Sequence, residues 1–354
     1  MNSSAAASPT LKQRLTALAY TRPMAIIIVF FLALCAILPL FLNNYWLTIV
    51  ISTFCVIISA YGIQMLMGYG GQLQAGHCAF MAVGAYASAI IATKLGIPFW
   101  VSVPLATIMA GLFGMLVALV SMRLKGFYLI ISTVAAQAVI LYVIVHWVSL
   151  TGGAFGMTAP APKIGSFAFD RPNSYYYIAL AALILVTYLC YNLARTNVGR
   201  AFVAIRDNEL AASAIGVNVA WHKYVAFFVG CALAGLGGAL AAHSRGVITP
   251  DGYSMMESFY YMCYIVVGGI GTITGTYFGV IFFAILYQGL NILLTALAAI
   301  FPTALSLLSP IMMLIMGTSI AVFITLIPKG MAYYWFIYTA KLKIKYFTQL
   351  QAQQ

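Results

Sequence analysis

The fold class is decided by residues 258–300, which read SFYYMCYIVVGGIGTITGTYFGVIFFAILYQGLNILLTALAAI. The charge-free run continues to Pro328, so 71 consecutive residues contain no Asp, Glu, Lys or Arg. A membrane-spanning helix needs about 20 apolar residues, so this stretch alone has room for about three. Its apolar residues do not alternate with polar ones, which excludes the short alternating strands of a membrane β-barrel.

The rest of the chain has the same character. Of its 354 residues, 64% are hydrophobic and 6% are charged, whereas soluble domains carry about 25% charged residues. This composition excludes a soluble enzyme and predicts an all-α polytopic membrane protein with about ten transmembrane helices. The predicted spans are 24–42, 46–67, 77–93, 98–121, 127–147, 175–194, 224–242, 257–272, 276–297 and 306–327.

The charge distribution predicts the orientation. With the N-terminus inside, 13 of the 17 basic residues fall on the cytoplasmic side, as the positive-inside rule requires. The net charge of +12 is then a membrane feature and not a sign of nucleic-acid binding. We expect one transmembrane domain, 24–328, between cytoplasmic segments 1–23 and 329–354. The aromatic residues and lysines of the last segment are typical of contact with membrane lipids.

Two glycine-rich stretches interrupt the apolar pattern, at 68–76 and 268–275. Glycine permits an unwound backbone or close helix contact, so we expect breaks within discontinuous helices at both places. Five predicted spans lie on either side of the predicted outer loop 149–174. That count suggests a 5+5 inverted pseudo-repeat, although the two halves share no visible sequence repeat.

The predicted cytoplasmic segment 195–223 carries four basic and two acidic residues. Asn197 can cap one short helix, and Asp207 or Asn208 can cap a second. Gly216 can end the second helix.

An apolar stripe in the same segment follows helical spacing at Val198, Phe202 and Ile205. A short helix with such a stripe fits a groove on a partner protein. It equally fits an interfacial helix that packs on its own bundle. The residues alone leave both interpretations open.

Six motifs then point to a family. They are Gly70–Tyr86 (GGQLQAGHCAFMAVGAY), Leu124–Ile140 (LKGFYLIISTVAAQAVI), Thr151–Gly156 (TGGAFG), 199–218 (GRAFVAIRDNELAASAIGVN), Ala226–Leu240 (AFFVGCALAGLGGAL) and Val266–Gly279 (VVGGIGTITGTYFG). In this order the chain resembles the LivM-type permeases of the branched-chain (hydrophobic) amino acid ABC importer family. The resemblance spans roughly 45 to 330. Gln74-Ala75 replaces the family's usual Ser-Leu, which leaves branched-chain amino acids, urea, short amides and aromatic acids open as substrates.

The resemblance implies a type II-like ABC importer permease in a bacterial inner membrane, with both termini cytoplasmic. Its partners would be a second, LivH-type permease, two ABC ATPase subunits and a periplasmic binding protein that faces 149–174. No phosphate-binding loop G-x-x-x-x-G-K-[ST] occurs in the chain. We therefore expect no cofactor in this chain, with ATP and Mg²⁺ bound by the ATPases. The residues implied in ATPase coupling are Gly199, Arg200, Arg206, Asp207, Glu209, Ala211, Ala212 and Gly216.

Polar groups at membrane depth must find partners or face a cavity. The candidates for the substrate path are those within the motifs, namely Gln72, Gln74, His77, Gln137, Thr151, Gly152 and Gly153. A buried glutamine more often bonds a neighbouring helix than a substrate. No catalytic cluster or metal-ligand spacing occurs, which argues against a membrane enzyme.

The remaining alternatives are a self-sufficient secondary transporter and a channel. A secondary transporter normally uses carboxylates inside the membrane for coupling. The five acidic residues lie in predicted loops or at span ends, which argues against proton coupling.

Overall fold

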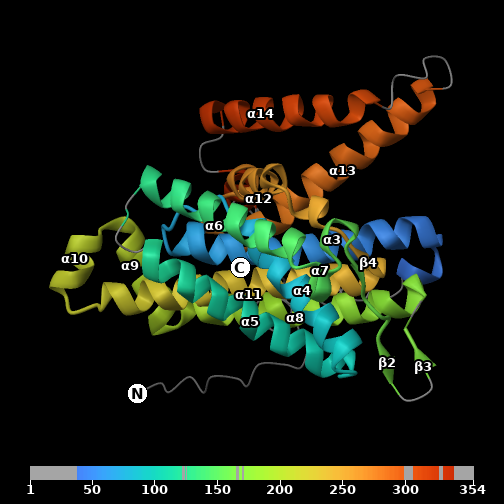
Figure 1. Ribbon diagram of the computed structural model, residues 1–354. Helices are drawn as coiled ribbons and strands as arrows, with labels where there is room; N and C mark the ends of the chain where they lie inside the picture. Colours follow the sequence, from blue (N-terminus) through green and yellow to red (C-terminus); the bar gives the residue numbers. More distant parts are fainter. Residues whose placement is uncertain are drawn as a thin grey trace, which may run out of the picture. The chain divides into compact units, whose positions relative to one another are not determined.

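The computed structural model describes residues 38–121, 124, 126–164, 167–169, 171–298, 306–326 and 330–338 (Figure 1). The chain divides into two compact units, Met1–Thr48 and Ile49–Gln354. In the first unit, the described part holds the short 3₁₀ helix η1 (Leu38–Leu40) and the beginning of α3. The predicted segment 1–23 and most of the predicted span 24–42 lie outside the described residues.

Long helices make up most of the second unit. They are α3 (Asn44–Ile63), continued by the π-helical turn η2 (Gln64–Tyr69), α4 (His77–Lys94), α5 (Phe99–Ser121), α6 (Phe127–His146), α8 (Pro172–Arg195), α11 (Val219–Arg245), α12 (Met255–Gly268), α13 (Ile273–Ala298) and α14 (Leu308–Leu326). Within the described residues, six helices are long and apolar enough to cross a membrane. They are Asn44–Tyr69, Phe99–Val120, Phe127–His146, Pro172–Arg195, Val219–Arg245 and Ile273–Ala298. The predicted helical membrane fold is confirmed, while the total of about ten spans and the pseudo-repeat stay predictions.

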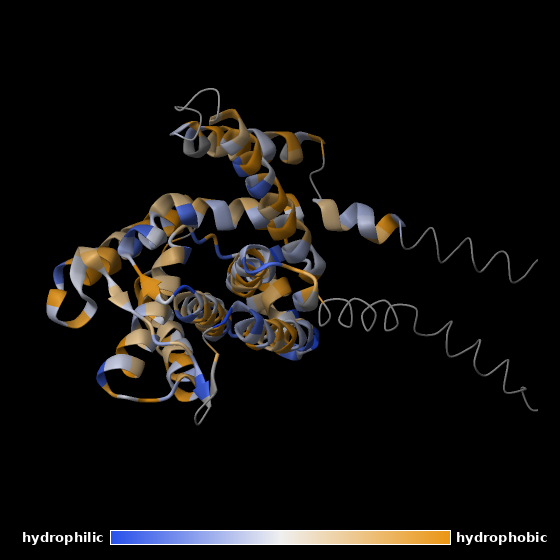
Figure 2. Ribbon diagram, turned by 90° about the vertical axis from the view of Figure 1, so that its right-hand side faces the viewer, coloured by the Kyte–Doolittle hydropathy of each residue, from blue (hydrophilic) through white to orange (hydrophobic). Residues whose placement is uncertain are grey.

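The surface of these helices is hydrophobic as well. Figure 2 shows the hydrophilic residues as short stretches among largely hydrophobic helices. Leu112 and Leu116 of α5 and Ile285 of α13 are among the large apolar side chains that stay exposed in the single chain. A helix that is apolar on all faces belongs in a membrane or inside a larger assembly.

The main core forms where α11 packs against α4 and α5. Small residues allow the close approach: a Cβ atom on Gly84 would lie 2.2 Å from the carbonyl oxygen of Gly235. Packing of small residues is the usual way in which helices associate in lipid. The most buried of these helices is α4, which contains few exposed residues.

A second, smaller core joins the C-terminal helices. Its buried members are Cys263, Val267, Phe283, Met312 and Met316, from α12, α13 and α14. The helices α12 and α13 are separated by a short break at Gly269–Thr272. The predicted span 257–272 is therefore a shorter helix of 14 residues, because glycine at φ +129° and +75° ends it at Gly269 and Gly271.

The loops form one group at each end of the helices. At one end lie α7 (Val148–Thr151), η3 (Gly153–Phe155), β1 (Met157–Thr158), β2 (Lys163–Ile164), β3 (Phe167–Ala168), β4 (Val247–Ile248) and η4 (Pro250–Tyr253). Strand β1 pairs antiparallel with β4, and β2 with β3. At the opposite end lie α9 (Asn197–Asp207) and α10 (Glu209–Ala214), as Figure 1 shows.

This grouping agrees with the predicted alternation of sides. The ammonium of Lys94 donates to the carbonyl oxygen of Ser149, and both residues were predicted to be outside. Arg206 contacts Gly68 and Gly271 at the other end, near segments that were predicted to be inside. Which of the two ends faces the cytoplasm stays a prediction from the charges.

Candidate functional site

The segment 195–223 forms two short helices, as its capping residues predicted. Thr196 caps α9, because its Oγ1 accepts from the backbone N–H of Gly199 at 3.3 Å. The prediction that Asn197 is this cap was wrong by one residue. Asn208 caps α10 by accepting from two backbone N–H groups at 3.0 Å. The helix α10 ends at Ala214, and Gly216 follows with φ +86°.

The apolar stripe of α9 settles the choice between a partner groove and the chain's own bundle. Phe202 and Ile205 are buried, and Val198 is half-buried. The helix packs on α8, α11 and η2. The stripe therefore holds α9 on its own bundle and is not available to a partner.

The exposed part of the segment is α10 and the turn after it. Leu210 and Ile215 are 77% and 76% exposed, although both are large and apolar. Exposed apolar side chains on a short protruding helix mark a surface that fits a partner. The candidate docking surface of the segment is therefore the α10 tip, which we define as Leu210 to Gly216.

Arg206 connects α9 to the membrane helices. Its Nη1 donates to the carbonyl oxygen of Gly68 at 2.9 Å. Its Nε and Nη2 both donate to Oδ1 of Asp207, at 3.0 and 2.9 Å. The planar guanidinium can hold both acceptors at once, so one side chain joins the end of α9 to the end of η2.

The two predicted glycine breaks meet at this side chain. A Cβ atom on Gly71, which has φ +66°, would lie 2.8 Å from Cγ of Arg206. One on Gly271 would lie 2.9 Å from Nη1 of Arg206. Only glycine fits against the arginine at both places, because φ is positive and the space is filled. The segment 195–223, the break after η2 and the break between α12 and α13 thus meet at one side chain, in a contact that we call the Arg206 junction.

Gln64 binds the two breaks to each other. Its Nε2 donates to the carbonyl oxygens of Gly269, at 3.2 Å, and Thr272, at 2.7 Å. These carbonyls belong to the short break between α12 and α13, where the carbonyl oxygen of Gly269 also accepts from the hydroxyl of Thr272 at 2.9 Å. Gln64 therefore satisfies the backbone of one break from the helix that leads into the other.

A second connection runs from α10 to α11. The Nζ atom of Lys223 lies 2.9 Å from Oε1 of Glu209, and the lysine side chain is only 7% exposed. The sequence marked Glu209 but missed Lys223. The signal was present, since Lys223 is the last of the basic residues in a segment that holds only two acids.

The other predicted coupling residues lie around these two connections. Gly199 and Ala212 are buried, whereas Arg200, Asp207, Ala211 and Gly216 are exposed. Arg200 donates to Oδ1 of Asn197 within the same helix.

The segment 70–76 runs through the interior without regular secondary structure. A Cβ atom on Gly76 would lie 2.1 Å from the carbonyl oxygen of Thr133 in α6. The backbone N–H of Ala75 donates to Oγ1 of Thr133 at 3.1 Å. Irregular backbone at membrane depth is tolerated when protein groups satisfy it in this way.

The four path candidates around this segment are buried. Gln72 donates to the carbonyl oxygen of Gly70, and Gln74 donates to the sulfur of Cys231. The Nε2 atom of His77 lies 3.0 Å from the carbonyl oxygen of Ser59. These contacts are all internal to the protein.

Gln137 joins three elements. Its Nε2 donates to the carbonyl oxygen of Tyr253 at 2.9 Å, and its Oε1 accepts from the hydroxyl of Ser258 at 3.0 Å. The same hydroxyl accepts from the backbone N–H of Cys78 at 3.0 Å. Gln137 of α6 thereby fixes the beginning of α4 relative to η4 and α12.

The remaining path candidates form a turn at the end of α6. Thr151 is buried, and its hydroxyl donates to the carbonyl oxygen of Ile144 at 2.6 Å. Gly152 and Gly153 have φ of +77° and +62°, which this turn requires. The structure buries Gln72, Gln74, His77 and Gln137 in the interior, each with its own partners, and leaves this turn at the loop end.

Among the described residues, no three His, Cys, Asp or Glu side chains gather where they could hold a metal ion. Five described cysteines are buried and free. Small apolar packing is the ordinary role of such cysteines.

Comparison with known proteins identifies the family. The profile of the family described as "Branched-chain amino acid transport system / permease component" matches residues 45–317. The chain belongs to this permease family. The permease is 28% identical over 258 residues to the high-affinity branched-chain amino acid transport system permease protein LivM of Escherichia coli strain K12. That match covers 66% of the permease and 61% of the relative.

Two further relatives carry the same kind of name. The permease is 26% identical to BraD of Pseudomonas aeruginosa, with 64% of its own chain and 78% of the relative covered. It is 27% identical to LivH of Escherichia coli strain K12, with the same coverage. Both are named high-affinity branched-chain amino acid transport system permease proteins. No solved structure matches the permease.

Proposed function

We propose that this chain is the permease subunit of a bacterial ABC importer that carries a branched-chain amino acid or a related small amphipathic solute. A second, LivH-type permease completes the translocation path, and a periplasmic binding protein delivers the solute. Two ABC ATPase subunits supply the energy and hold the ATP and Mg²⁺. The family membership and the names of the relatives support this proposal.

The Arg206 junction is the observation that carries the proposal. A permease without its own ATP site needs a mechanical connection from a docking surface to the membrane helices. The exposed α10 tip provides a docking surface, and the bond from Arg206 to Gly68 connects it to η2. The contact of Arg206 with Gly271 extends the connection to the break before α13.

The mechanism follows from this connection. Closure of the ATPases pulls on the α10 tip, and the ion pair between Glu209 and Lys223 transmits the movement to α11. Through Arg206 the same movement reaches the two unwound breaks. Unwound backbone bends more easily than a continuous helix, because it lacks the i to i−4 bonds. The path then opens alternately outward and inward.

The orientation proposed here places the α10 tip in the cytoplasm. The charge count supports it, since 13 of 17 basic residues then lie inside. The loop group with β1 and β4 then faces the periplasm, where the segment 149–174 would receive the binding protein.

Reconstitution tests the proposal. The chain is co-expressed with the permease, ATPases and binding protein that neighbouring genes encode, and the purified complex is placed in proteoliposomes. The uptake of radiolabelled L-leucine is then measured with and without ATP. We expect uptake that requires ATP, the ATPases and the binding protein. Uptake by the chain without any ATPase would instead identify a secondary transporter or a channel.

A matched pair of variants tests the docking surface. Leu210→Glu places a charge on the α10 tip and should abolish co-purification of the ATPases. Val247→Glu makes the same kind of change at an exposed apolar residue of β4, at the opposite end of the helices. This variant should still co-purify with the ATPases. Equal retention of the ATPases by both variants would exclude the α10 tip as the docking surface.

A further inference from the structure

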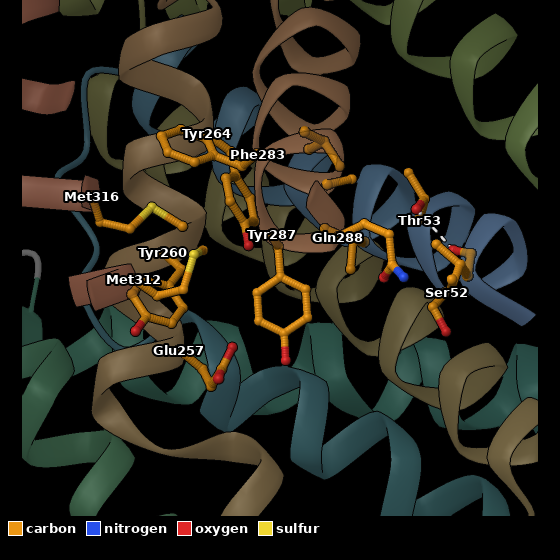
Figure 3. Close-up of a pocket in the computed structure, with 14 residues that line it drawn as sticks. Ser52, Thr53, Glu257, Tyr260, Tyr264, Phe283, Tyr287, Gln288, Met312 and Met316 are labelled. Carbon is orange, nitrogen blue, oxygen red and sulfur yellow. Dashed lines mark hydrogen bonds between the residues drawn. The ribbon is translucent and has the colours of Figure 1, made fainter. Parts of the chain in front are cut away.

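A cavity of about 390 Å³ lies between α3, α12, α13 and α14 (Figure 3). None of the path candidates from the motifs lines it. Its volume falls within the range of about 300–1,000 Å³ that is usual for small-molecule sites.

Helical spacing explains why these side chains line the cavity. On α13, Val280, Phe283 and Tyr287 line it, at i, i+3 and i+7. On α12, Glu257, Tyr260 and Tyr264 line it at the same spacing. Residues at this spacing share one face of a helix, so each helix turns one face to the cavity.

The lining combines a single carboxylate with aromatic rings and an apolar wall. Figure 3 shows Glu257, Tyr260 and Tyr287 with their polar ends in the same part of the cavity. Within the described residues, the carboxylate of Glu257 has no ion-pair or hydrogen-bond partner. Arg245 attracts it only from a longer distance. A half-buried carboxylate beside tyrosine faces is a favourable site for an ammonium group.

The opposite part of the cavity offers different groups. Figure 3 shows Gln288 and Ser52 across the view from Glu257. An amide and a hydroxyl can donate hydrogen bonds to a carboxylate. Met312 and Phe283 also line the cavity and supply apolar surface, and methionine adapts to apolar groups of different shape.

The cavity lies toward the loop group that contains β4. Glu257 is in the first turn of α12, and α12 follows directly on η4 and β4. In the proposed orientation this is the periplasmic half of the permease. A solute released by a binding protein would enter the membrane domain from that side.

We propose that this cavity is the chain's own solute site and binds an α-amino acid with an apolar side chain. The carboxylate of Glu257 accepts hydrogen bonds from the ammonium group of the solute. Gln288 and Ser52 donate hydrogen bonds to the carboxylate of the solute. Met312 and Phe283 contact the apolar side chain. This assignment rests on the proposed function for the identity of the solute, but the preference of the cavity for a cation does not depend on it.

Transport by the reconstituted complex is the first arm of the test. Glu257→Gln should lower the uptake of L-leucine about tenfold or more at saturating loaded binding protein, while ATP hydrolysis stimulated by the binding protein persists. Asp251→Asn is the matched control, because Asp251 is an exposed acid in η4 at the same end. Equal uptake by both variants overturns the site.

Thiol labelling is the second arm and needs no transport. Ala284 of α13 lines the cavity. The substitution Ala284→Cys adds only one sulfur atom to this side chain, so it changes the volume of the cavity little. The rate of modification of this thiol in the assembled complex is compared for a trimethylammonium and a sulfonate methanethiosulfonate reagent, with the unsubstituted chain as background. We expect the cationic reagent to modify the thiol faster than the anionic one. The ratio of the two rates should fall about tenfold when Glu257→Gln is added and should not change when Asp251→Asn is added.

The two arms separate the site from the proposed function. If the wild-type complex takes up no L-leucine but the cationic preference depends on Glu257, the site stands and the proposed solute is wrong. If the preference does not depend on Glu257, the site is wrong whatever the transport assay gives.

Discussion

The guanidinium of Arg206 donates a hydrogen bond of 2.9 Å to the carbonyl oxygen of Gly68, across 138 residues of sequence. A carbonyl at the end of a helical segment has no partner within that segment, so the arginine of one element completes the backbone of another. The same side chain lies against Gly271. One residue of the segment 195–223 therefore contacts both glycine-rich breaks of the described helices, the one after η2 and the one between α12 and α13.

Replacement of this arginine should uncouple ATP hydrolysis from transport. Arg206→Ala removes the bond to Gly68, and we expect uptake to fall about tenfold while the ATPases still bind and hydrolyse ATP. The measurement is the ratio of L-leucine transported to ATP hydrolysed in proteoliposomes. Arg195→Ala, at an exposed arginine of the same end whose side chain lies over the ring of Tyr191, is the control. An unchanged ratio in Arg206→Ala would contradict the junction.

Breaking the ion pair between α10 and α11 should destabilise the chain. Glu209→Gln leaves the buried ammonium of Lys223 without its counter-charge, at a cost of about 1–3 kcal/mol. Adding Lys223→Met should restore part of this loss, because a buried apolar residue needs no partner. Thermal unfolding of the detergent-solubilised complex measures both. If the double variant is less stable than Glu209→Gln alone, the loss of stability in Glu209→Gln does not come from the unpaired ammonium of Lys223.

The close approach of α4 and α11 should not tolerate a methyl group. Gly84→Ala places a Cβ atom 2.2 Å from the carbonyl oxygen of Gly235, and the helices must separate at a cost of about 1–3 kcal/mol. Gly289→Ala in α13 is the control, since nothing lies within 4 Å of its Cβ position. We expect a lower unfolding temperature and lower membrane abundance for Gly84→Ala only. Similar values for both variants would exclude this contact as a determinant of stability.

Gln137 should act on stability and not on affinity for the solute. Gln137→Leu removes the bonds to Tyr253 and Ser258, which should cost about 1–3 kcal/mol. We expect a lower unfolding temperature and a lower maximal uptake rate, with an unchanged KM for the solute-loaded binding protein and unchanged competition among solutes. A change in which solutes compete would place Gln137 in the substrate path after all.

The sequence predicted the helical membrane fold because charge is excluded from lipid wherever the chain crosses it. It also located both breaks, since Gly68–Gly71 and Gly268–Gly271 stand out in apolar surroundings. The caps of α9 and α10 were predicted within one residue, because capping depends on the next three residues of the chain. Apolar composition, glycine-rich breaks and helix caps are local properties, so the composition and periodicity of short stretches of sequence predict them.

The tertiary structure decided which of these features meet. The spacing of residues within the segment 195–223 did not indicate that Phe202 and Ile205 of α9 are buried against the chain's own helices while Leu210 of α10 is exposed. No pattern along the chain indicated that Arg206 contacts Gly68, that Glu209 pairs with Lys223, or that Glu257 and Tyr287 line one cavity. Such pairings depend on how the helices are arranged around one another. That arrangement follows from side-chain packing between distant segments, which the spacing of residues along one chain does not contain.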